Sequence, residues 1–383
     1  MPPRSIFLDL PAALVEELLG KTPELSRTVV RQLEDRARQR RELRDRLAAR
    51  GLLARVEELP SVPIPTSCGV DGSIVVERLL AHDLLITGAL AVEGLTPPSE
   101  ERHWPEPRHA IWIELEHHAE GNDELARAMM AGLEVELAAH APHEVVLLDG
   151  SLATPVIAFD QAIRALAARS ELTATTDAFW QRLPTWLELL HRSLASSPAR
   201  QCWLGIPKYT TRRDIANLLG APDPADDRAL LTALLEPGEY TAPIPLQPGR
   251  RPHGFSSELL PAHLRGRVSH LALALLRSLA DLRVVYLRPH RWLPALRLEL
   301  PAGAASDPSR LAGVLAVVQY QSARGALVEP FPLFLADRMV RHLRRAARAL
   351  RHAVREAASR EYPSFEEIFL ALESYRSEAL RSP

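Results

Sequence analysis

Asp71 and Asp149 each begin the same tripeptide, Asp-Gly-Ser, and each directly follows an apolar run that is typical of a β-strand. Glycine allows the chain to turn tightly, so we expect each aspartate at the end of its strand with room for a ligand. If the two strands are neighbours, the two carboxylates repel each other and favour a divalent cation between them. Asp-Gly is also a common turn pair, so two ordinary strand-ending turns are the alternative interpretation.

A metal site of this kind requires further carboxylates. The helix expected over residues 122–140 carries Glu134 and Glu136 beside its apolar stripe, and either side chain can reach back over the sheet toward the aspartates. Glu114 and Glu116, on the strand before this helix, are competitors. For each glutamate taken singly, a solvent-facing position is the ordinary alternative.

Lys208 follows an apolar strand expected over residues 202–206, and it is one of only two lysines in the sequence. An ammonium group at this place can bind a phosphate or stabilise charge on a leaving oxygen. Arg212 and Arg213 would extend the same patch along a phosphate backbone. A simple surface lysine is the alternative.

A helix expected from residue 337 onward is rich in arginine at helical spacing, which makes it a candidate stripe for binding a nucleic-acid backbone. A solvated face paired with nearby acids is the favoured alternative. Its arginines are Arg338, Arg341, Arg344, Arg345, Arg348, Arg351 and Arg355. The sequence contains no Walker-type phosphate loop and no HExxH pattern, and neither Asp-Gly-Ser tripeptide has the flanking glycine of a hydrolase nucleophile elbow.

The composition is that of a soluble protein with a substantial core, since 46% of the 383 residues are hydrophobic and 25% are charged. The net charge is only −2, so any nucleic acid must be bound by a local basic patch. Two cysteines, Cys68 and Cys202, are too few for a disulfide framework and favour a reducing, cytoplasmic location. The N-terminus does not resemble a signal peptide, and no apolar run is long enough to span a bilayer.

The periodicity predicts helix over most of the first sixty residues, ended by a proline cluster at 59–67. Strands at 66–71, 73–78 and 84–92 then predict an antiparallel meander, and a further strand is expected at 110–116. After the helix at 122–140, the run at 144–149 reads as a strand that is buried on both faces of a sheet. A meander, a helix and a parallel strand predict a mixed α/β sheet flanked by helices, which is the opening arrangement of RNase H-like domains.

Further elements are expected along the rest of the chain. The predicted helices cover residues 156–170, 176–195, 226–235, 259–282, 333–360 and 364–379, and the predicted late strands cover 284–287 and 295–300. We therefore divide the chain into an N-terminal helical arm at 1–60, a central domain at 61–337, and C-terminal helices at 338–383 that pack on this domain.

Six motifs follow one another in order: GVDGS, a glutamate-bearing helix before VVLLDGSL, GIPK, DRALLTALLEPGEY, VVYL…LRLELP and EPFPLFLAD. No single motif is specific, but together, from about Asp71 to Asp337, they resemble the NurA nucleases. Members of this family work beside the HerA-type hexameric DNA-translocating ATPase in processing DNA ends. The resemblance implies an RNase H-like nuclease, commonly dimeric, that uses a divalent metal, usually Mn²⁺ with Mg²⁺ as an alternative.

The family's site residues can be carried over onto matching positions. Asp71 matches the first metal-binding aspartate, Asp149 the second, and Lys208 the lysine of the third motif. Glu134 matches the helical glutamate by its spacing, although Glu136 stays open. We therefore take Asp71, Glu134, Asp149 and Lys208 as the predicted catalytic residues.

The last motif departs from the family pattern, because this chain has Glu329 and Asp337 where many members have Tyr and His. An aspartate can still bind a hard cation, so Asp337 is a predicted fourth metal ligand. Glu329 is left outside the predicted site.

The resemblance predicts an enzyme that cleaves single-stranded DNA endonucleolytically and as a 5′–3′ exonuclease, in DNA repair or defence. Asp71, Glu134, Asp149 and Asp337 would hold one or two Mn²⁺ or Mg²⁺ ions. In a two-metal arrangement, the ions would activate water and stabilise the leaving 3′ oxygen, while Lys208 would stabilise the added negative charge. The rival hypothesis is a non-catalytic dimeric adaptor that docks DNA ends onto a translocase. A third is another RNase H-like enzyme, such as a transposase or an RNA–DNA hybrid nuclease.

Overall fold

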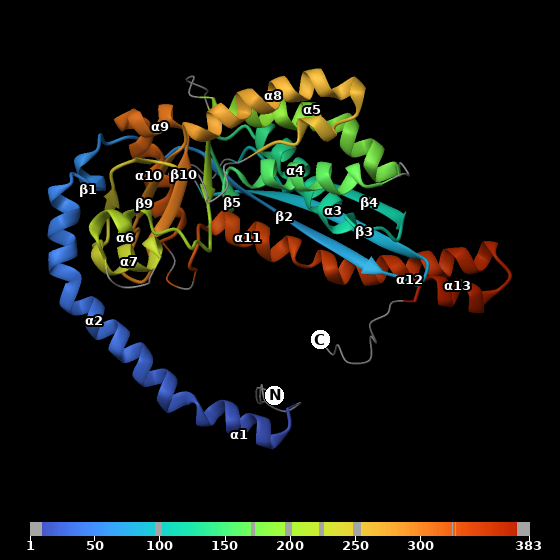
Figure 1. Cartoon of the computed structure of the whole chain (residues 1–383), viewed down its shortest axis with the longest axis horizontal. Coiled ribbons are helices and arrows are strands. Elements are labelled where there is room, and N and C mark those ends of the chain that lie inside the picture. Colours follow the sequence, from blue (N-terminus) through green and yellow to red (C-terminus); the bar gives the residue numbers. More distant parts are fainter. Residues whose placement is uncertain are drawn as a thin grey trace.

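The structure, a computed structural model, describes residues 10–95, 102–169, 173–195, 201–221, 226–247, 254–323, 325 and 327–373. Ten strands within these ranges form one sheet (Figure 1). They are β1 (Leu53–Arg55), β2 (Ser67–Arg78), β3 (His82–Glu93), β4 (Arg108–His117), β5 (Val145–Asp149), β6 (Cys202–Ile206), β7 (Glu239–Thr241), β8 (Ile244–Pro245), β9 (Arg283–Leu287) and β10 (Leu296–Leu300).

Helices surround this sheet. The α-helices are α1 (Ala12–Gly20), α2 (Thr22–Ala49), α3 (Asn122–Ala139), α4 (Thr154–Ala167), α5 (Ala174–Leu194), α6 (Asp214–Leu219), α7 (Asp227–Leu234), α8 (Ala262–Ala280), α9 (Ala302–Ser306), α10 (Pro308–Gln321), α11 (Phe331–Val340), α12 (Leu343–Glu361) and α13 (Phe365–Ala371). The described residues also contain two short 3₁₀ helices, η1 (Val56–Glu58) and η2 (Ser257–Leu259). The last predicted helix extends to residue 379, and its part beyond residue 373 lies outside the described residues.

The strand order is β1-β7-β9-β10-β6-β5-β2-β3-β4. An antiparallel meander is present, but its strands differ from the predicted ones: residues 66–71 and 73–78 belong to the single strand β2, and β3 and β4 complete the meander. β5 then joins β2 in parallel, with β6 parallel to β5 on its other side. The helix α3 makes the crossover between β4 and β5. The predicted RNase H-like mixed sheet is therefore confirmed.

The sheet lies between two layers of helices (Figure 1). On one face, α3, α4, α5 and α8 bury an apolar core that includes Val146 and Leu148 of β5. On the other face, α10 and the start of α11 bury Val145 and Leu147 of the same strand. Successive side chains of a strand point to opposite faces, so the uninterrupted apolar run of β5 is buried on both sides, as predicted.

The first Asp-Gly-Ser tripeptide lies in the middle of a strand, and the prediction of a strand end at Asp71 is wrong. β2 is continuous because β3 pairs with it from Cys68 to Arg78, straight through Gly72. The second tripeptide does turn: Gly150 has φ +99°, a left-handed conformation that favours glycine. Identical tripeptides therefore adopt different structures, because a pairing partner continues along β2 but not along β5.

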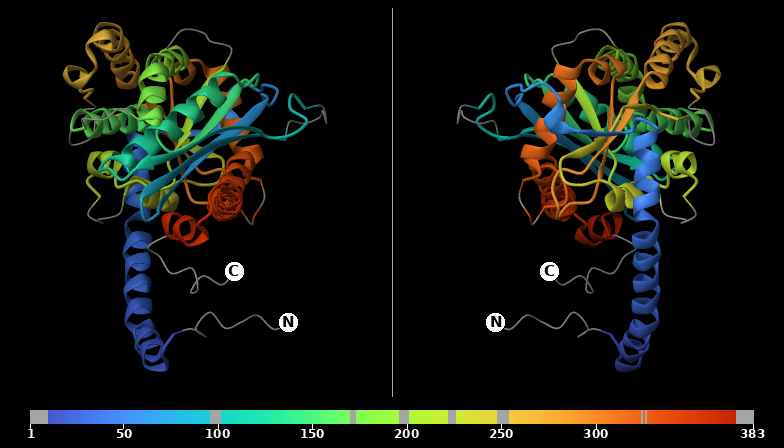
Figure 2. Two further views of the ribbon diagram at one scale, coloured as in Figure 1. Left: turned by 90° about the vertical axis from the view of Figure 1, so that its right-hand side faces the viewer. Right: turned by 90° about the vertical axis from the view of Figure 1, so that its left-hand side faces the viewer.

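The N-terminal segment is only partly a free arm. The body of α2 projects from the molecule and carries α1 at its far end (Figure 2), while Leu43 and Leu47 near its C-terminus are buried against α6 and α7. The chain then turns at Gly51, with φ +67°, and β1 pairs with β7 at the edge of the sheet. Helix was predicted over most of residues 1–60, but α2 ends at Ala49.

Two further differences concern the C-terminal half. The helix α10 was not predicted, although Asp307 caps it by accepting hydrogen bonds from the backbone N–H groups of Ser309 and Arg310. The single helix predicted over 333–360 is broken into α11 and α12 between Val340 and Leu343. Within the described parts of the chain, helices long and apolar enough to cross a membrane are absent.

Candidate metal centre

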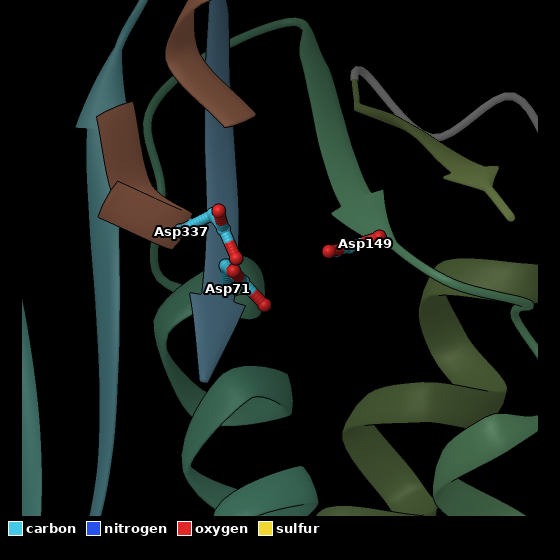
Figure 3. Close-up of side chains that lie close together, drawn as sticks. All are labelled: Asp71, Asp149 and Asp337. Atoms are coloured by element: carbon cyan, nitrogen blue, oxygen red, sulfur yellow. The ribbon is translucent and has the colours of Figure 1, made fainter. Parts of the chain in front are cut away.

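Asp71, Asp149 and Asp337 come together from three elements, β2, β5 and α11 (Figure 3). One carboxylate oxygen from each lies within 4.8 Å of the other two. The parallel register explains the first pair: Val70 is paired with Leu148, and each aspartate is the next residue of its strand. Both carboxylates therefore lie where β5 ends and β2 continues without it.

Asp337 reaches this place because α11 approaches β2 closely at Gly69. A Cβ added to Gly69 would lie 2.5 Å from the backbone nitrogen of Leu333, so any side chain there would push the helix away. Asp337 follows Leu333 by one helical turn and therefore lies on the same side of α11. The GVDGS and EPFPLFLAD motifs, 260 residues apart in sequence, build this part of the site together.

Glu134 approaches the aspartates from the α3 side of the sheet. A Cβ on Gly72 would lie 2.4 Å from Glu134 Oε1, so the missing side chain of Gly72 is what makes room for this carboxylate. Glu134 is outside the group of three aspartates that meets within 4.8 Å. Glu136 points elsewhere, since its Oε1 accepts a hydrogen bond of 2.7 Å from Trp186 Nε1.

Lys208 lies among these acids, just after β6 ends. Its Nζ is 2.8 Å from Asp149 Oδ2, 2.9 Å from Glu329 Oε2 and 3.8 Å from Asp337 Oδ1. Glu329, which was not among the predicted site residues, is thus an ion-pair partner of Lys208. Arg228 on α7 holds this segment by donating a hydrogen bond to the backbone carbonyl of Lys208.

The electrostatics of the site favour an added positive charge. Burial, followed by the charge of Asp149, raises the pKa of Asp71 to about 7, although Lys208 opposes the shift. Burial and then the charges of Asp71 and Asp149 raise the pKa of Glu134 well above its ordinary value. Burial acts to lower the pKa of Lys208, but its bonds with Asp149 and Glu329 raise it overall.

The donor set fits a hard divalent cation. Three carboxylate oxygens can face one ion, and carboxylate oxygen suits Mg²⁺ and Mn²⁺. The acids at this site outnumber the bases. Within the described ranges, the ion pairs of Asp149, Glu329 and Asp337 at this site involve two bases, Lys208 and the exposed Arg341, which pairs with Asp337 at 2.9 Å, while Asp71 and Glu134 add two further carboxylates. A cation would reduce the repulsion that the pKa shifts report.

Four further residues were candidates for the site: Arg212, Arg213, Glu114 and Glu116. Arg212 is engaged within the fold, since it donates to Asp214 at 3.0 Å and to the backbone carbonyl of Gln247 at 2.6 Å. Arg213 is half-buried beside it. Glu116 is buried and accepts a hydrogen bond from the backbone of Thr175, and Glu114 lies on the same strand, β4, outside the group of aspartates.

The arginines of the segment from residue 337 onward, a candidate stripe for binding a nucleic-acid backbone, differ in their burial. Arg351 is buried and lies 3.6 Å from Glu77 of β2, while Arg355 packs over the ring of Phe369 and pairs with Glu373. These two arginines hold α12 and α13 in place, whereas Arg344 and Arg345 face solvent.

The sheet order and the carboxylates at its centre define an RNase H-like α/β protein with a candidate metal centre. The sequence model of the NurA domain matches residues 65–342, and the chain belongs to the NurA family. No curated protein matched the sequence.

Two solved structures with TM-scores above 0.5 agree in fold. The NurA nuclease from Sulfolobus solfataricus is 13% identical with a TM-score of 0.53, and the alignment covers 86% of this chain and 92% of that one. A second NurA structure is 14% identical with a TM-score of 0.53, over 91% of this chain and 99% of that one. A third, NurA with manganese, is 15% identical with a TM-score of 0.49, over 87% and 98% of the two chains.

Proposed function

We propose that this protein is a metal-dependent nuclease that hydrolyses phosphodiester bonds in DNA. The observation that carries the proposal is the convergence of Asp71, Asp149 and Asp337 within 4.8 Å beside a lysine. Membership of the NurA family supports the same activity. Carboxylates packed this closely repel each other, and a bound cation would relieve this repulsion.

Each side chain has a distinct task in this proposal. The three aspartates hold Mn²⁺, or Mg²⁺ in its place, and Glu134 is a further carboxylate close to the ion on the α3 side of the sheet. When bound, such an ion supplies Lewis-acid stabilisation of phosphoryl oxygens and lowers the pKa of a coordinated water. Lys208 keeps its proton, because its acidic neighbours raise its pKa, and stabilises the charge that develops on the phosphoryl group.

The substrate and partners are further parts of the proposal. Lys208 and Arg213 bind phosphates, so recognition is largely independent of base sequence. The protein acts on single strands and duplex ends, as an endonuclease and a 5′–3′ exonuclease. It works in the cytoplasm as a homodimer beside a HerA-type hexameric ATPase, in DNA-end processing for repair or defence.

A cleavage assay tests the proposal. We expect Asp71→Ala and Asp149→Ala each to abolish Mn²⁺-dependent cleavage of a labelled single strand. Asp35→Ala, at an exposed acid of α2, is the matched control and should cleave like the wild type. Undiminished cleavage by both site variants would end the proposal.

The rival function, a non-catalytic adaptor that binds DNA ends for a translocase, has one feature in its favour. Glu329 and Asp337 replace the Tyr and His that many family members carry in the last motif. An adaptor of this kind would bind DNA but would neither cleave it nor bind Mn²⁺ through Asp71 and Asp149. Calorimetric titration with Mn²⁺ separates the two functions.

A further inference from the structure

The turn that follows Asp149 is held by a buried acid from a distant strand. Glu299 of β10 accepts hydrogen bonds on its Oε2 from Ser151 Oγ at 2.6 Å and from the backbone N–H of Leu152 at 3.1 Å. The side chain of Glu299 is only 2% exposed. Two consecutive residues of the Asp149 turn are thus fixed by one carboxylate oxygen.

Glu299 reaches this turn across β6, at the one place where β6 has no side chain. Gly205 of β6 is paired with Glu299 on one side and with Leu148 on the other. A Cβ on Gly205 would lie 2.9 Å from the carbonyl oxygen of Gly150 and 3.0 Å from the backbone nitrogen of Leu152. Any larger residue would therefore lift the turn away from Glu299.

The second oxygen of Glu299 is held equally firmly. Arg297, two residues earlier on the same face of β10, donates to Oε1 through Nε at 3.0 Å and through Nη2 at 2.8 Å. Arg297 Nη1 lies 3.3 Å from Tyr286 OH, which in turn lies 3.4 Å from Asp227 Oδ2. The chain of contacts joins residues of the DRALLTALLEPGEY and VVYL…LRLELP motifs to the Asp149 turn.

We propose that Glu299 is a positioning residue for the metal ligand Asp149. Its carboxylate, oriented by Arg297, fixes the turn at Ser151 and Leu152 and so directs the Asp149 side chain toward Asp71. Loss of an outer-shell residue that keeps a metal ligand in place typically costs about 10- to 100-fold in metal affinity. The inference rests on the proposed function, because it requires that Asp149 binds a metal ion.

A general role in stability is the competing explanation, and Glu239 provides a control for it. Glu239 of β7 is also buried, accepts two hydrogen bonds of 2.6 Å from Arg44, and accepts a third from the backbone N–H of Glu236. β9, β10 and β6 separate β7 from β5 in the sheet. Glu239→Gln therefore removes a comparable buried pair far from the turn.

The test measures Mn²⁺ affinity by calorimetry on the full chain, beside the unfolding midpoint of each variant. In Glu299→Gln the amide cannot accept from both Arg297 and the turn, so we expect Mn²⁺ to bind about 10- to 100-fold more weakly. Ser151→Ala, a milder change that spares the core, should weaken binding in the same direction. Ser151→Thr keeps the hydroxyl and should restore the wild-type affinity.

The outcomes are separable. Weaker Mn²⁺ binding by Glu299→Gln and Ser151→Ala, with normal binding by Glu239→Gln, supports the positioning role. If Glu299→Gln does not fold, the comparison of Mn²⁺ affinity between Ser151→Ala and Ser151→Thr is enough to test the inference. Equal affinities for the serine variants and the wild type, or an equal loss in Glu239→Gln, would overturn the inference. If the wild type itself binds no Mn²⁺, the proposed function fails instead.

Discussion

Asp71 and Asp149 directly follow Val70 and Leu148, which are paired in the parallel ladder between β2 and β5. The ladder ends there, and only β2 continues, now paired with β3 alone. The aspartates therefore lie beside each other at the carboxyl edge of β5, although only one of them terminates a strand. The helix α11, on the face of the sheet opposite α3, brings Asp337 to the same point.

Replacing Lys208 with methionine should reduce cleavage by about 10²- to 10³-fold, as loss of one transition-state donor does in other enzymes. It should also destabilise the metal-free protein, because Asp149 and Glu329 lose their shared cation. Cleavage rates and urea unfolding check the two effects. Lys21→Met, at the exposed and only other lysine, should change neither quantity. A fully active Lys208→Met protein would remove the lysine from the mechanism.

Replacing Gly72 with alanine should displace Glu134, because the new methyl carbon would lie only 2.4 Å from Glu134 Oε1. The obstructing atoms belong to flexible side chains, so we expect a folded protein with a loss of stability of about 1–3 kcal/mol and reduced cleavage. Gly266→Ala in α8, where no atom lies within 4 Å, is the control. Its helical position predicts a small gain in stability and normal cleavage. Wild-type rates for Gly72→Ala would argue against a role for Glu134.

Binding of single-stranded DNA to a catalytically inactive variant should weaken steeply as the salt concentration rises, since phosphate contacts release counterions. Arg213→Ala should lower the slope of log affinity against log salt by about 1, with a similar effect on unrelated sequences. Fluorescence anisotropy with labelled single strands measures this slope. Arg38→Ala, at an exposed arginine of α2, should leave the slope unchanged. An unchanged slope for Arg213→Ala would place the phosphate contact elsewhere.

The attachment of α2 to the domain should depend on pH through Glu239. Burial acts to raise the pKa of Glu239, but hydrogen bonds from Arg44 and from the backbone N–H of Glu236, with the charges of Arg44 and Arg55, lower it overall. A lowered folded-state pKa means that this contribution is present above the ordinary value of about 4.3 and is lost as pH falls through the folded-state pKa.

Urea unfolding of the wild type and Glu239→Gln measures this contribution. At pH 7 we expect the variant to be less stable by about 1–3 kcal/mol, since it loses hydrogen bonds to a charged group. The difference between the two proteins should shrink as the solution is acidified below about pH 4. A difference that stays constant down to acid pH would show that the ionised carboxylate contributes nothing.

Local patterns predicted the parts of the site that depend on local structure. The apolar run before Asp149 and the glycine after it are enough to indicate a buried strand and a turn, and Gly150 has the left-handed φ that such a turn requires. The same reasoning failed at Asp71. Whether β2 ends or continues there is decided by its pairing with β3, which is a contact between strands and not a property of the tripeptide.

The residues that were not predicted, Glu329 and Glu299, contact residues that are far from them in the sequence. Glu329 joins the site only because α11 and the segment before it pack beside β2 and meet Lys208, 121 residues earlier. Glu299 contacts Ser151 only because β10 and β5 lie on either side of β6 at a glycine. Both residues belong to recognised motifs, so their presence was visible, but their contacts follow from the order of strands in the sheet.

The most direct test of the central claim is the crystal structure of the protein soaked with Mn²⁺, with anomalous scattering recorded for manganese. The proposed site predicts an anomalous peak that contacts carboxylate oxygens of Asp71, Asp149 and Asp337, and that is absent from crystals of Asp71→Asn. No peak at these residues in the soaked wild type, or a peak that persists unchanged in the variant, would contradict the metal centre.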